Sequence, residues 1–332
     1  MYDGIVNVYK EQGFTSHDVV AKLRSVFGQK KIGHTGTLDP MAEGVLIIVL
    51  GRATKLADMI LSKKKQYIAT MKIGLTSETD DITGERLVPG DETKFSELFS
   101  DETELRNKIS ELFETFLGKS MQIPPMYSAI KVNGRKLYEY ARAGEQVERT
   151  PREIEIYSLE LLDIDISTKE IKFSVECSKG TYIRSLIRDM GEKLGVGAVM
   201  SGLLRDDVNG IKAENAYKIS DLIALKEEGR LEEAVIPMDE LLRSVPAVSV
   251  NESGAKYLSN GNRLRRENLS NIPENTGSSD KSYINTGSAD DKSEIYTVIE
   301  NARFFRVYSE GELKALYTYD KTKKDFKVYK ML

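Results

Sequence analysis

The chain contains very few of the side chains that form disulfides or bind zinc. Its 332 residues include one cysteine, Cys177, two histidines, His17 and His34, and no tryptophan. A single cysteine excludes an internal disulfide, and so small a set of cysteines and histidines argues strongly against a zinc site. We therefore expect a protein that holds no metal.

Long hydrophobic runs are also missing. No apolar stretch approaches the roughly 20 residues that a helix needs to cross a bilayer. The N-terminus, Met1-Tyr2-Asp3-Gly4, has neither a basic segment nor a long apolar one, so it does not resemble a secretory signal. These absences predict a cytoplasmic protein with no membrane partner.

The remaining composition is that of an ordinary globular protein. Hydrophobic residues make up 40% of the chain and charged residues 30%, which allows a substantial core. The length favours more than one domain.

The charges are unevenly distributed along the chain. The net charge of −4 argues at first sight against a nucleic-acid partner. However, residues 1–72 carry 11 basic and 6 acidic side chains, residues 78–114 carry 4 and 12, and residues 119–152 carry 7 and 3. Two basic regions on either side of an acidic one could form a directed positive surface. Solvated charged faces are the commoner cause of such blocks, so both interpretations stay open.

Hydrophobic periodicity predicts an α+β fold, without the regular alternation of strand and helix that nucleotide-binding folds show. We expect strands over 4–9, 44–50, 67–74, 153–163, 170–177 and 198–205. Helices are expected from an N-cap at Ser16 to Val26, over 105–117, from Thr181 to Leu194, and over 219–228. Residues 75–104 are predicted to be mostly a polar, acidic connection.

The character of the sequence changes near Pro246. Short strand-like segments follow, at 247–250, 302–308, 313–319 and 326–329. Between them, residues 266–294 are rich in Ser, Asn, Asp and Gly, which is typical of a flexible surface insertion. We therefore predict a small C-terminal β domain.

One octapeptide, residues 33–40 (GHTGTLDP), combines the features of a chemical site. Its two glycines permit close backbone approach, and Pro40 restricts the backbone of Asp39. Three less specific interpretations compete. Asp39 followed by proline is typical of a helix N-cap, and His34 alone is more often structural. The glycine-rich loop also resembles a phosphate-binding loop, but it lacks the Gly-Lys-Ser/Thr ending, so this signal is weak.

Two further segments carry candidate residues. Tyr67 would ordinarily be a half-buried strand tyrosine, and Lys63 to Lys65 a solvated strand end. Arg184 lies near a helix start, where the helix dipole disfavours a cation, so we expect it to have an acidic partner. Asp39 is a candidate for that partner, because a paired arginine keeps a carboxylate ionised and oriented.

Together these motifs resemble the TruB-type pseudouridine synthases. The resemblance covers about residues 1–240 nearly continuously, with the octapeptide as its signature and the other motifs in the right order. It is carried by Lys64-Gln66-Tyr67, Gly74 to Gly84, Gln122-Ile123-Pro124-Pro125-Met126-Tyr127-Ser128-Ala129, Lys131 to Arg142, Ser178-Lys179-Gly180-Thr181-Tyr182-Ile183-Arg184 and Leu203-Leu204-Arg205. Glu11, where relatives usually have proline, and the Ser/Asn-rich insertion depart from the family pattern.

The resemblance implies a fold and a domain plan. It implies a mixed, largely antiparallel sheet with flanking helices for a catalytic domain at residues 1–243. Within this domain, residues 119–152 would be a mobile segment that closes on RNA, although they also suit a static surface loop. Residues 244–332 resemble, less strongly, a small β-barrel-like RNA-binding domain of the PUA type.

The resemblance also implies the reaction. Family members isomerise uridine 55 in the T loop of tRNA to pseudouridine, without cofactor or metal. The target base is flipped out of its stack, cut from ribose at N1 and rejoined through C5. We expect a monomer that binds the T stem-loop.

Residue roles follow from the same resemblance. Asp39 would be the nucleophile or promote glycosidic cleavage, with Arg184 paired to it, and Tyr67 would stack on the flipped base. The other expected substrate contacts are His34, Tyr182 and Leu203 around the base, and Lys63, Lys64, Lys131, Arg135 and Arg142 at phosphates.

Two other functions remain as alternatives. The chain could be an RNA-binding or tRNA-folding protein in which isomerisation does not matter. It could also be the catalytic subunit of a guide-RNA-dependent synthase, which shares the same signature. The basic segment at 119–152 favours a stand-alone enzyme.

Overall fold

The structure is a computed structural model that describes residues 1–60, 64–84, 87–98, 101–270 and 292–332. The strands of the first 243 residues are β1 Gly4–Lys10, β2 Ile32–His34, β3 Glu43–Leu50, β4 Lys64–Ile73, β5 Leu75–Ser77, β6 Leu87–Pro89, β7 Gly118–Gln122, β8 Lys131–Val132, β9 Arg135–Lys136, β10 Arg152–Asp165, β11 Glu170–Ser178, β12 Ala198–Val208, β13 Ile211–Lys212 and β14 Ile236–Pro237. The α-helices are α1 Ser16–Phe27, α2 Ala57–Ile60, α3 Glu92–Leu98, α4 Glu102–Glu114, α5 Leu137–Arg142, α6 Ile183–Leu194, α7 Ile219–Glu227 and α8 Met238–Leu241.

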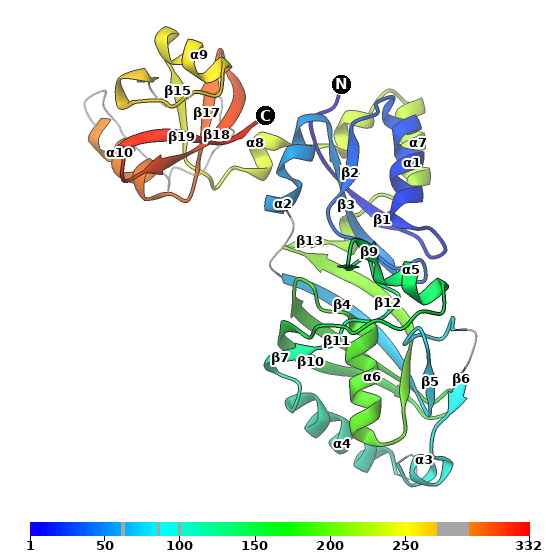
Figure 1. The fold of residues 1–332 in the computed structure, drawn as a ribbon. Coiled ribbons are helices and arrows are strands. Elements are labelled where there is room, and N and C mark those ends of the chain that lie inside the picture. The colour runs from blue at the N-terminus through cyan, green and yellow to red at the C-terminus, as the bar shows by residue number, and fades with distance from the viewer. Residues whose placement is uncertain (61–63, 85–86, 99–100, 271–291) are drawn as a thin grey trace.

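A single large sheet runs through this part of the molecule (Figure 1). Its strand order is β14-β1-β3-β12-β4-β11-β10-β7, with β2 added beside β3 and β13 beside β12. Every pairing is antiparallel except that of β3 with β12. At that junction Gly44 has a positive φ of 100°, and a Cβ there would lie 2.3 Å from the Arg205 carbonyl oxygen. The predicted mixed, largely antiparallel α+β fold is confirmed.

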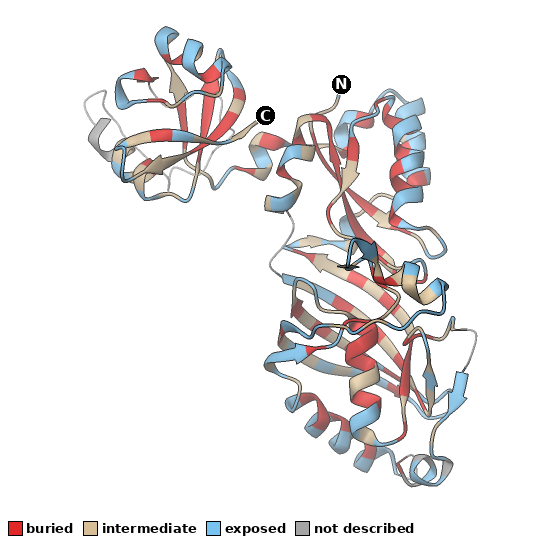
Figure 2. Cartoon of the chain, in the orientation of Figure 1, coloured by how far each residue is buried: buried red, intermediate tan, exposed pale blue. Residues whose placement is uncertain are grey.

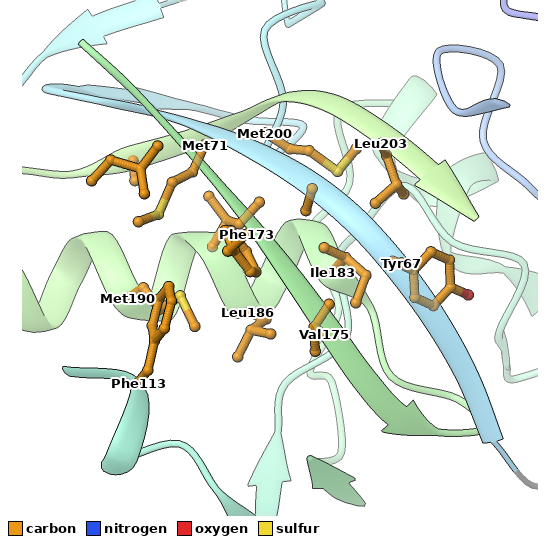
Figure 3. Packing of buried hydrophobic residues seen from close by; sticks show 14 of the residues in the cluster. Tyr67, Met71, Phe113, Phe173, Val175, Ile183, Leu186, Met190, Met200 and Leu203 are labelled. Atoms are coloured by element: carbon orange, nitrogen blue, oxygen red, sulfur yellow. The ribbon is translucent and has the colours of Figure 1, made fainter. Parts of the chain in front are cut away.

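One face of the central strands is covered by α6 and α4. The α6 residues Ile183, Leu186, Ile187 and Met190 recur at helical spacing and are all buried. They pack on Phe173 and neighbouring side chains of β4, β11 and β12 (Figure 3). Tyr67 and Leu203 belong to the same apolar layer and lie at one end of it, where the pocket described below opens.

A second layer forms around β1 and β3. Helices α1 and α7 cover one face of these strands, as the buried stripe on α1 shows in Figure 2. The N-cap of α1 is Thr15, not Ser16 as predicted, because Thr15 and Asp18 form a capping box. Ser16 is thereby free to bond the backbone of Leu38 instead.

The C-terminal residues form a separate five-stranded sheet, which confirms the predicted β domain. Its elements are β15 Ala247–Val250, α9 Glu252–Ser259, β16 Leu269–Ser270, α10 Lys292–Asn301, β17 Phe305–Ser309, β18 Glu312–Asp320 and β19 Asp325–Met331. Buried side chains of β17 and β18 pack with those of β1 and β3, so the two sheets share one apolar cluster. The fully buried Arg306 bonds the Val245 carbonyl 2.9 Å away at the junction.

Several boundaries differ from the predictions. Residues 75–104 are not only a connection, since they contain the β5–β6 hairpin, α3 and the start of α4. The strand expected over 302–308 begins at Phe305. Most of the predicted insertion, residues 271–291, lies outside the described residues, while 266–270 form a short 3₁₀ turn and β16. Among the described residues, no helix is long and apolar enough to cross a membrane.

Candidate active site

The octapeptide connects β2 to β3 and carries Asp39 at its far end. His34 ends β2, and the backbone N–H of Thr35 still donates to Ile47 of β3 at 3.0 Å. Asp39 is not a helix N-cap, because only a turn follows it, closed by the Ala42 N–H on the Asp39 carbonyl at 3.0 Å. The carboxylate therefore does not satisfy a helix terminus and can interact with other groups.

Three side chains from other segments hold this loop in place. The Arg205 guanidinium, on β12, donates to the carbonyls of Val45 at 2.7 Å, Thr37 at 3.4 Å and Gly36 at 3.4 Å. The Ser16 hydroxyl accepts from the Leu38 N–H at 2.9 Å. Lys10, which is fully buried, donates to the Pro40 carbonyl at 3.3 Å. Because the loop backbone is bonded on several sides, Asp39 is held in a fixed position.

The structure places the Arg184 guanidinium directly against Asp39. Arg184 Nε lies 2.9 Å from Asp39 Oδ2, and Nη2 donates to Oδ1 at 3.3 Å. The same guanidinium donates to the carbonyls of Thr79 at 3.0 Å and Tyr127 at 2.9 Å. Arg184 lies in the first turn of α6, whose dipole disfavours a cation, so these acceptors offset that cost.

A second carboxylate completes the arrangement. Asp81 Oδ2 lies 3.4 Å from Arg184 Nη1, and its side chain is almost fully buried. One turn further along α6, Arg188 pairs with Asp80 at 3.0 Å. The sequence pattern predicted Asp80 and Asp81 only as part of an acidic connection. The available signal was a pair of acidic residues that matches two arginines spaced four apart on one helix face.

Opposing effects act on the Asp39 carboxyl. Burial and the nearby Asp81 charge raise its pKa above the ordinary value, while Arg184 and Lys10 act to lower it. The net direction is upward, with burial as the largest cause. The side chain is nevertheless 35% exposed. A carboxylate that is accessible and held in orientation by a guanidinium is well suited to attack a sugar carbon or to remove a proton.

A cavity of about 560 Å³ opens above Asp39, a size typical of small-molecule sites. Its wall brings together residues from α1, β4, β12, the 127–142 segment and the start of α6. They include Ser16, His17, Asp39, Lys65, Tyr67, Tyr127, Lys136, Tyr138, Arg142, Tyr182, Arg184 and Leu203. The cavity can therefore receive one planar base with its sugar.

Tyr67 and Leu203 form apolar wall on neighbouring strands. Both are buried, at 6% and 9% exposure. Burial raises the pKa of the Tyr67 hydroxyl to about 12, although Arg205 acts in the opposite direction. The hydroxyl is therefore a very weak base at neutral pH, and its ring offers a surface for stacking.

Tyr182 stands at the N-cap of α6, where Gln122 fixes its backbone through bonds of 2.9 and 3.1 Å. The structure does not bring His34 into the cavity wall; His17 lies there instead. The two histidine rings are perpendicular, 5.4 Å apart, and burial lowers the pKa of His34. His34 therefore lies behind the cavity and supports its wall.

The expected phosphate contacts have different surroundings. Lys63 lies outside the described residues. Lys64 is exposed and paired with Glu176 at 3.1 Å. Lys131 is exposed on β8, and Arg135 pairs with Glu145 at 3.1 Å.

Arg142 is the member of the expected phosphate set that lines the cavity, with its guanidinium 5.5 Å from the centre of the Tyr138 ring. Sequence reasoning missed Lys10, Lys65, Asp81 and Arg205. Each belongs to a segment that carried the family resemblance or adjoined it, but none had a local pattern that marks chemistry. Their involvement depends on contacts between distant segments.

Comparison with known proteins places this arrangement in a family. The family model described as TruB family pseudouridylate synthase (N terminal domain) matches residues 24–183. The model described as tRNA pseudouridylate synthase B C-terminal domain matches residues 184–243, directly after it. The chain belongs to the TruB family of pseudouridylate synthases. It is an isomerase that forms pseudouridine in tRNA.

Individual relatives agree with this assignment. The tRNA pseudouridine synthase B of Clostridium acetobutylicum is 43% identical over 82% of this chain and 89% of its own length. That of Clostridium tetani is 37% identical over 99% of both chains. Among solved structures, a Cbf5-Nop10-Gar1 complex contains a chain with a TM-score of 0.65 and 26% identity, covering 99% of this chain and 84% of that one.

Proposed function

We propose that this TruB family member modifies uridine 55 in the T loop of tRNA as a stand-alone, monomeric enzyme. The observation that carries the proposal is the Asp39 carboxylate, held by Arg184 at 2.9 Å beneath a cavity of about 560 Å³. A cavity of this size suits a single nucleotide that has left its stack, because a base inside a stack cannot enter such a cavity.

In this proposal the flipped uracil stacks on Tyr67, Leu203 contacts it from the neighbouring strand, and Tyr182 closes the cavity beside it. Flipping costs a few kcal/mol, which base–aromatic stacking of about 1–3 kcal/mol and phosphate contacts offset. Asp39 then attacks C1′ or removes a sugar proton, and the glycosidic bond breaks. The Asp39 side chain is 35% exposed, so the sugar can reach it, and Arg184 keeps its orientation fixed for the reaction.

We further propose that residues 119–152 close over the bound nucleotide. In support, Lys136, Tyr138 and Arg142 of this segment already line the cavity. The exposed Lys131 and Arg135 would then contact the RNA backbone. The C-terminal β domain would extend the RNA contact, and the lysines of its β18–β19 hairpin suit a phosphate backbone.

The decisive experiment incubates the purified protein with unmodified tRNA and maps pseudouridine by position. Conversion at uridine 55 alone, abolished in Asp39→Asn, is the expected result. Conversion at another position would refute the positional part of the proposal. Conversion by Asp39→Asn at the wild-type rate would refute the role of Asp39.

The likeness to the Cbf5 chain of a multi-protein complex raises a second candidate, a subunit that works with a guide RNA. The same assay separates the two. Activity of the purified chain on tRNA without added RNA or protein supports the stand-alone enzyme. Activity only with a guide RNA supports the subunit.

A further inference from the structure

The cationic side chains in the cavity wall are not equivalent. Four of them are described there: Lys65, Lys136, Arg142 and Arg184. Arg184 is engaged by two carboxylates, and Lys136 donates to the Tyr138 hydroxyl at 3.3 Å, with Arg142 over the same ring. Lys65 has no hydrogen bond or ion pair with any residue that the structure describes. Its charge is therefore available to a ligand.

The position of Lys65 follows from strand geometry. It precedes Tyr67 by two residues on β4, so both side chains project from the same face of the sheet, with Cα atoms about 7 Å apart. β4 is a central strand, and Lys65 is in register with Cys177 on β11 and Val208 on β12. An extended lysine side chain can bridge that spacing and reach a base stacked on Tyr67.

The preceding residue shows the opposite situation. Lys64 projects from the other face, pairs with Glu176 at 3.1 Å and lies 4.3 Å from the centre of the Tyr157 ring. It is also more than half exposed. Two adjacent lysines of the same strand thus differ in direction, burial and partnership, which provides a matched control.

The surroundings of Lys65 do not neutralise its charge. Burial and the Arg205 guanidinium on β12 lower its pKa to about 8. Cys177 on β11 acts in the other direction, but burial raises the pKa of that thiol to about 12, so it is neutral. Burying an ammonium group without a counter-ion costs folding free energy. Charges kept at such a cost are typical of functional positions.

We propose that Lys65 is a catalytic residue that places its positive charge against the uracil ring as the glycosidic bond breaks. This inference rests on the proposed function above. When the C1′–N1 bond breaks, its electron pair leaves with the base, which becomes an anion with charge over N1, O2 and O4. The ammonium stabilises that charge where it develops.

The rest of the isomerisation balances. The uracil anion bonds to C1′ through C5, the C5 proton is then lost, and N1 gains a proton, so no atom is gained or lost overall. Arg184, Arg205 and Lys10 cannot provide this charge, because each is already bonded to carboxylate or backbone oxygens around Asp39. Lys136 and Arg142 lie against Tyr138, so among the cations described in the cavity wall Lys65 is the one on the strand of Tyr67 that is left for the base.

The first test compares Lys65→Met with Lys64→Met in single-turnover reactions on a T-stem-loop RNA at saturating protein. We expect Lys65→Met to slow the reaction by about 100-fold or more while RNA affinity and its salt dependence stay unchanged. Lys64→Met, at an expected phosphate contact, should instead weaken RNA binding, with no comparable loss of rate at saturating protein. Lys65→Arg should recover part of the loss. The melting temperature of Lys65→Met should equal or exceed that of the wild type, because an unpaired charge has been removed; Lys65→Gln provides a second neutral variant.

A second test changes the leaving group. A stem-loop with 5-fluorouridine at the target position carries a base whose anion is intrinsically more stable. If Lys65 stabilises the departing base, the deficit of Lys65→Met in consuming this nucleotide should shrink by about tenfold. A deficit of equal size on both RNAs overturns the proposal.

The pH profile gives an independent readout. The wild-type rate should fall on the alkaline side near pH 8, as Lys65 loses its proton, and the fall should be smaller in Lys65→Arg. Tyr67 on the same strand and Cys177 stay protonated to about pH 12, so they do not obscure this change. Lys10, which bonds the Pro40 carbonyl beside Asp39, also has a pKa of about 8, so the part of the fall that Lys65→Arg removes is the part assigned to Lys65.

Two other outcomes also overturn the proposal. Weaker RNA binding with a flatter salt dependence and an unchanged rate at saturation would make Lys65 a phosphate contact instead. An unchanged rate and affinity would remove it from the site. Both are distinguishable from failure of the proposed function, which would appear in the wild-type protein as pseudouridine at a position other than uridine 55.

Discussion

Replacing Arg184 by methionine tests the physical core of the site. Methionine keeps much of the side-chain length but removes the charge that lies between Asp39 and Asp81. The Asp81 side chain is only 6% exposed, so its carboxylate would remain buried without a counter-ion. Breaking a buried pair in this way typically costs about 3–5 kcal/mol of unfolding free energy.

For a domain of this size, that cost corresponds to a fall in melting temperature of roughly 6 °C or more. The deficit should shrink as the pH falls, because the pKa of Asp39 is already raised by burial and protonation of that carboxyl removes one of the two charges that lost their partner. Arg184 is also the largest influence that lowers the Asp39 pKa, so its loss raises that pKa further. Since the ionised carboxylate reacts, the acid limb of the pH–rate profile should move to higher pH, with a rate loss of at least about 100-fold from misorientation.

Arg188→Met provides the matched control. Arg188 lies one turn further along α6 and pairs with Asp80 at 3.0 Å and Asp189 at 2.6 Å. Its loss should lower stability without moving the acid limb. The double variant Arg184→Met/Asp81→Asn should regain much of the stability but not the activity. An Arg184→Met protein with wild-type stability and an unmoved acid limb would refute the role given to this ion-pair network.

Three further substitutions have defined outcomes. Tyr67→Phe should keep RNA binding and lose less than about tenfold in rate, because a hydroxyl with a pKa of about 12 contributes little as a base; abolished turnover with intact binding would contradict this. Arg205→Met should remove the hydrogen bonds to the loop carbonyls and lower the single-turnover rate by about 100-fold or more. Equal rates would show that the loop keeps its conformation without Arg205. Lys10→Met should have a melting temperature at pH 7 equal to or above that of the wild type, because burial of the Lys10 charge is unfavourable. Burial lowers the Lys10 pKa to about 8, so the folded wild type loses this charge as the pH rises and should gain stability relative to the variant between pH 8 and 10. Thermal melts of both proteins at pH 7 and at pH 10 measure this difference.

Much of the fold was predictable because its signals are local. Val19, Leu23 and Val26 on α1 repeat at helical spacing, and residues 44–50 are an apolar run long enough only for a buried strand. The boundaries of helices were less well predicted where a side chain can bond either its own helix end or a distant segment. Ser16 had the right chemistry for a helix cap, but Thr15 forms the cap and Ser16 bonds the loop around Leu38.

The sequence by itself determined the family, through the octapeptide around Asp39 and the later motifs in order, and it suggested that Arg184 needs an acidic partner. The tertiary structure decided which charges meet. Asp81, Arg205 and Lys65 come from different strands and loops, and only the register of β4, β11 and β12 and the docking of α6 bring them to the octapeptide. The physical reason is that burial and counter-ions, which set the reactivity of a charged group, depend on neighbours far away in the chain. A run of three lysines gives no sign, in sequence, that one faces solvent and another faces the cavity.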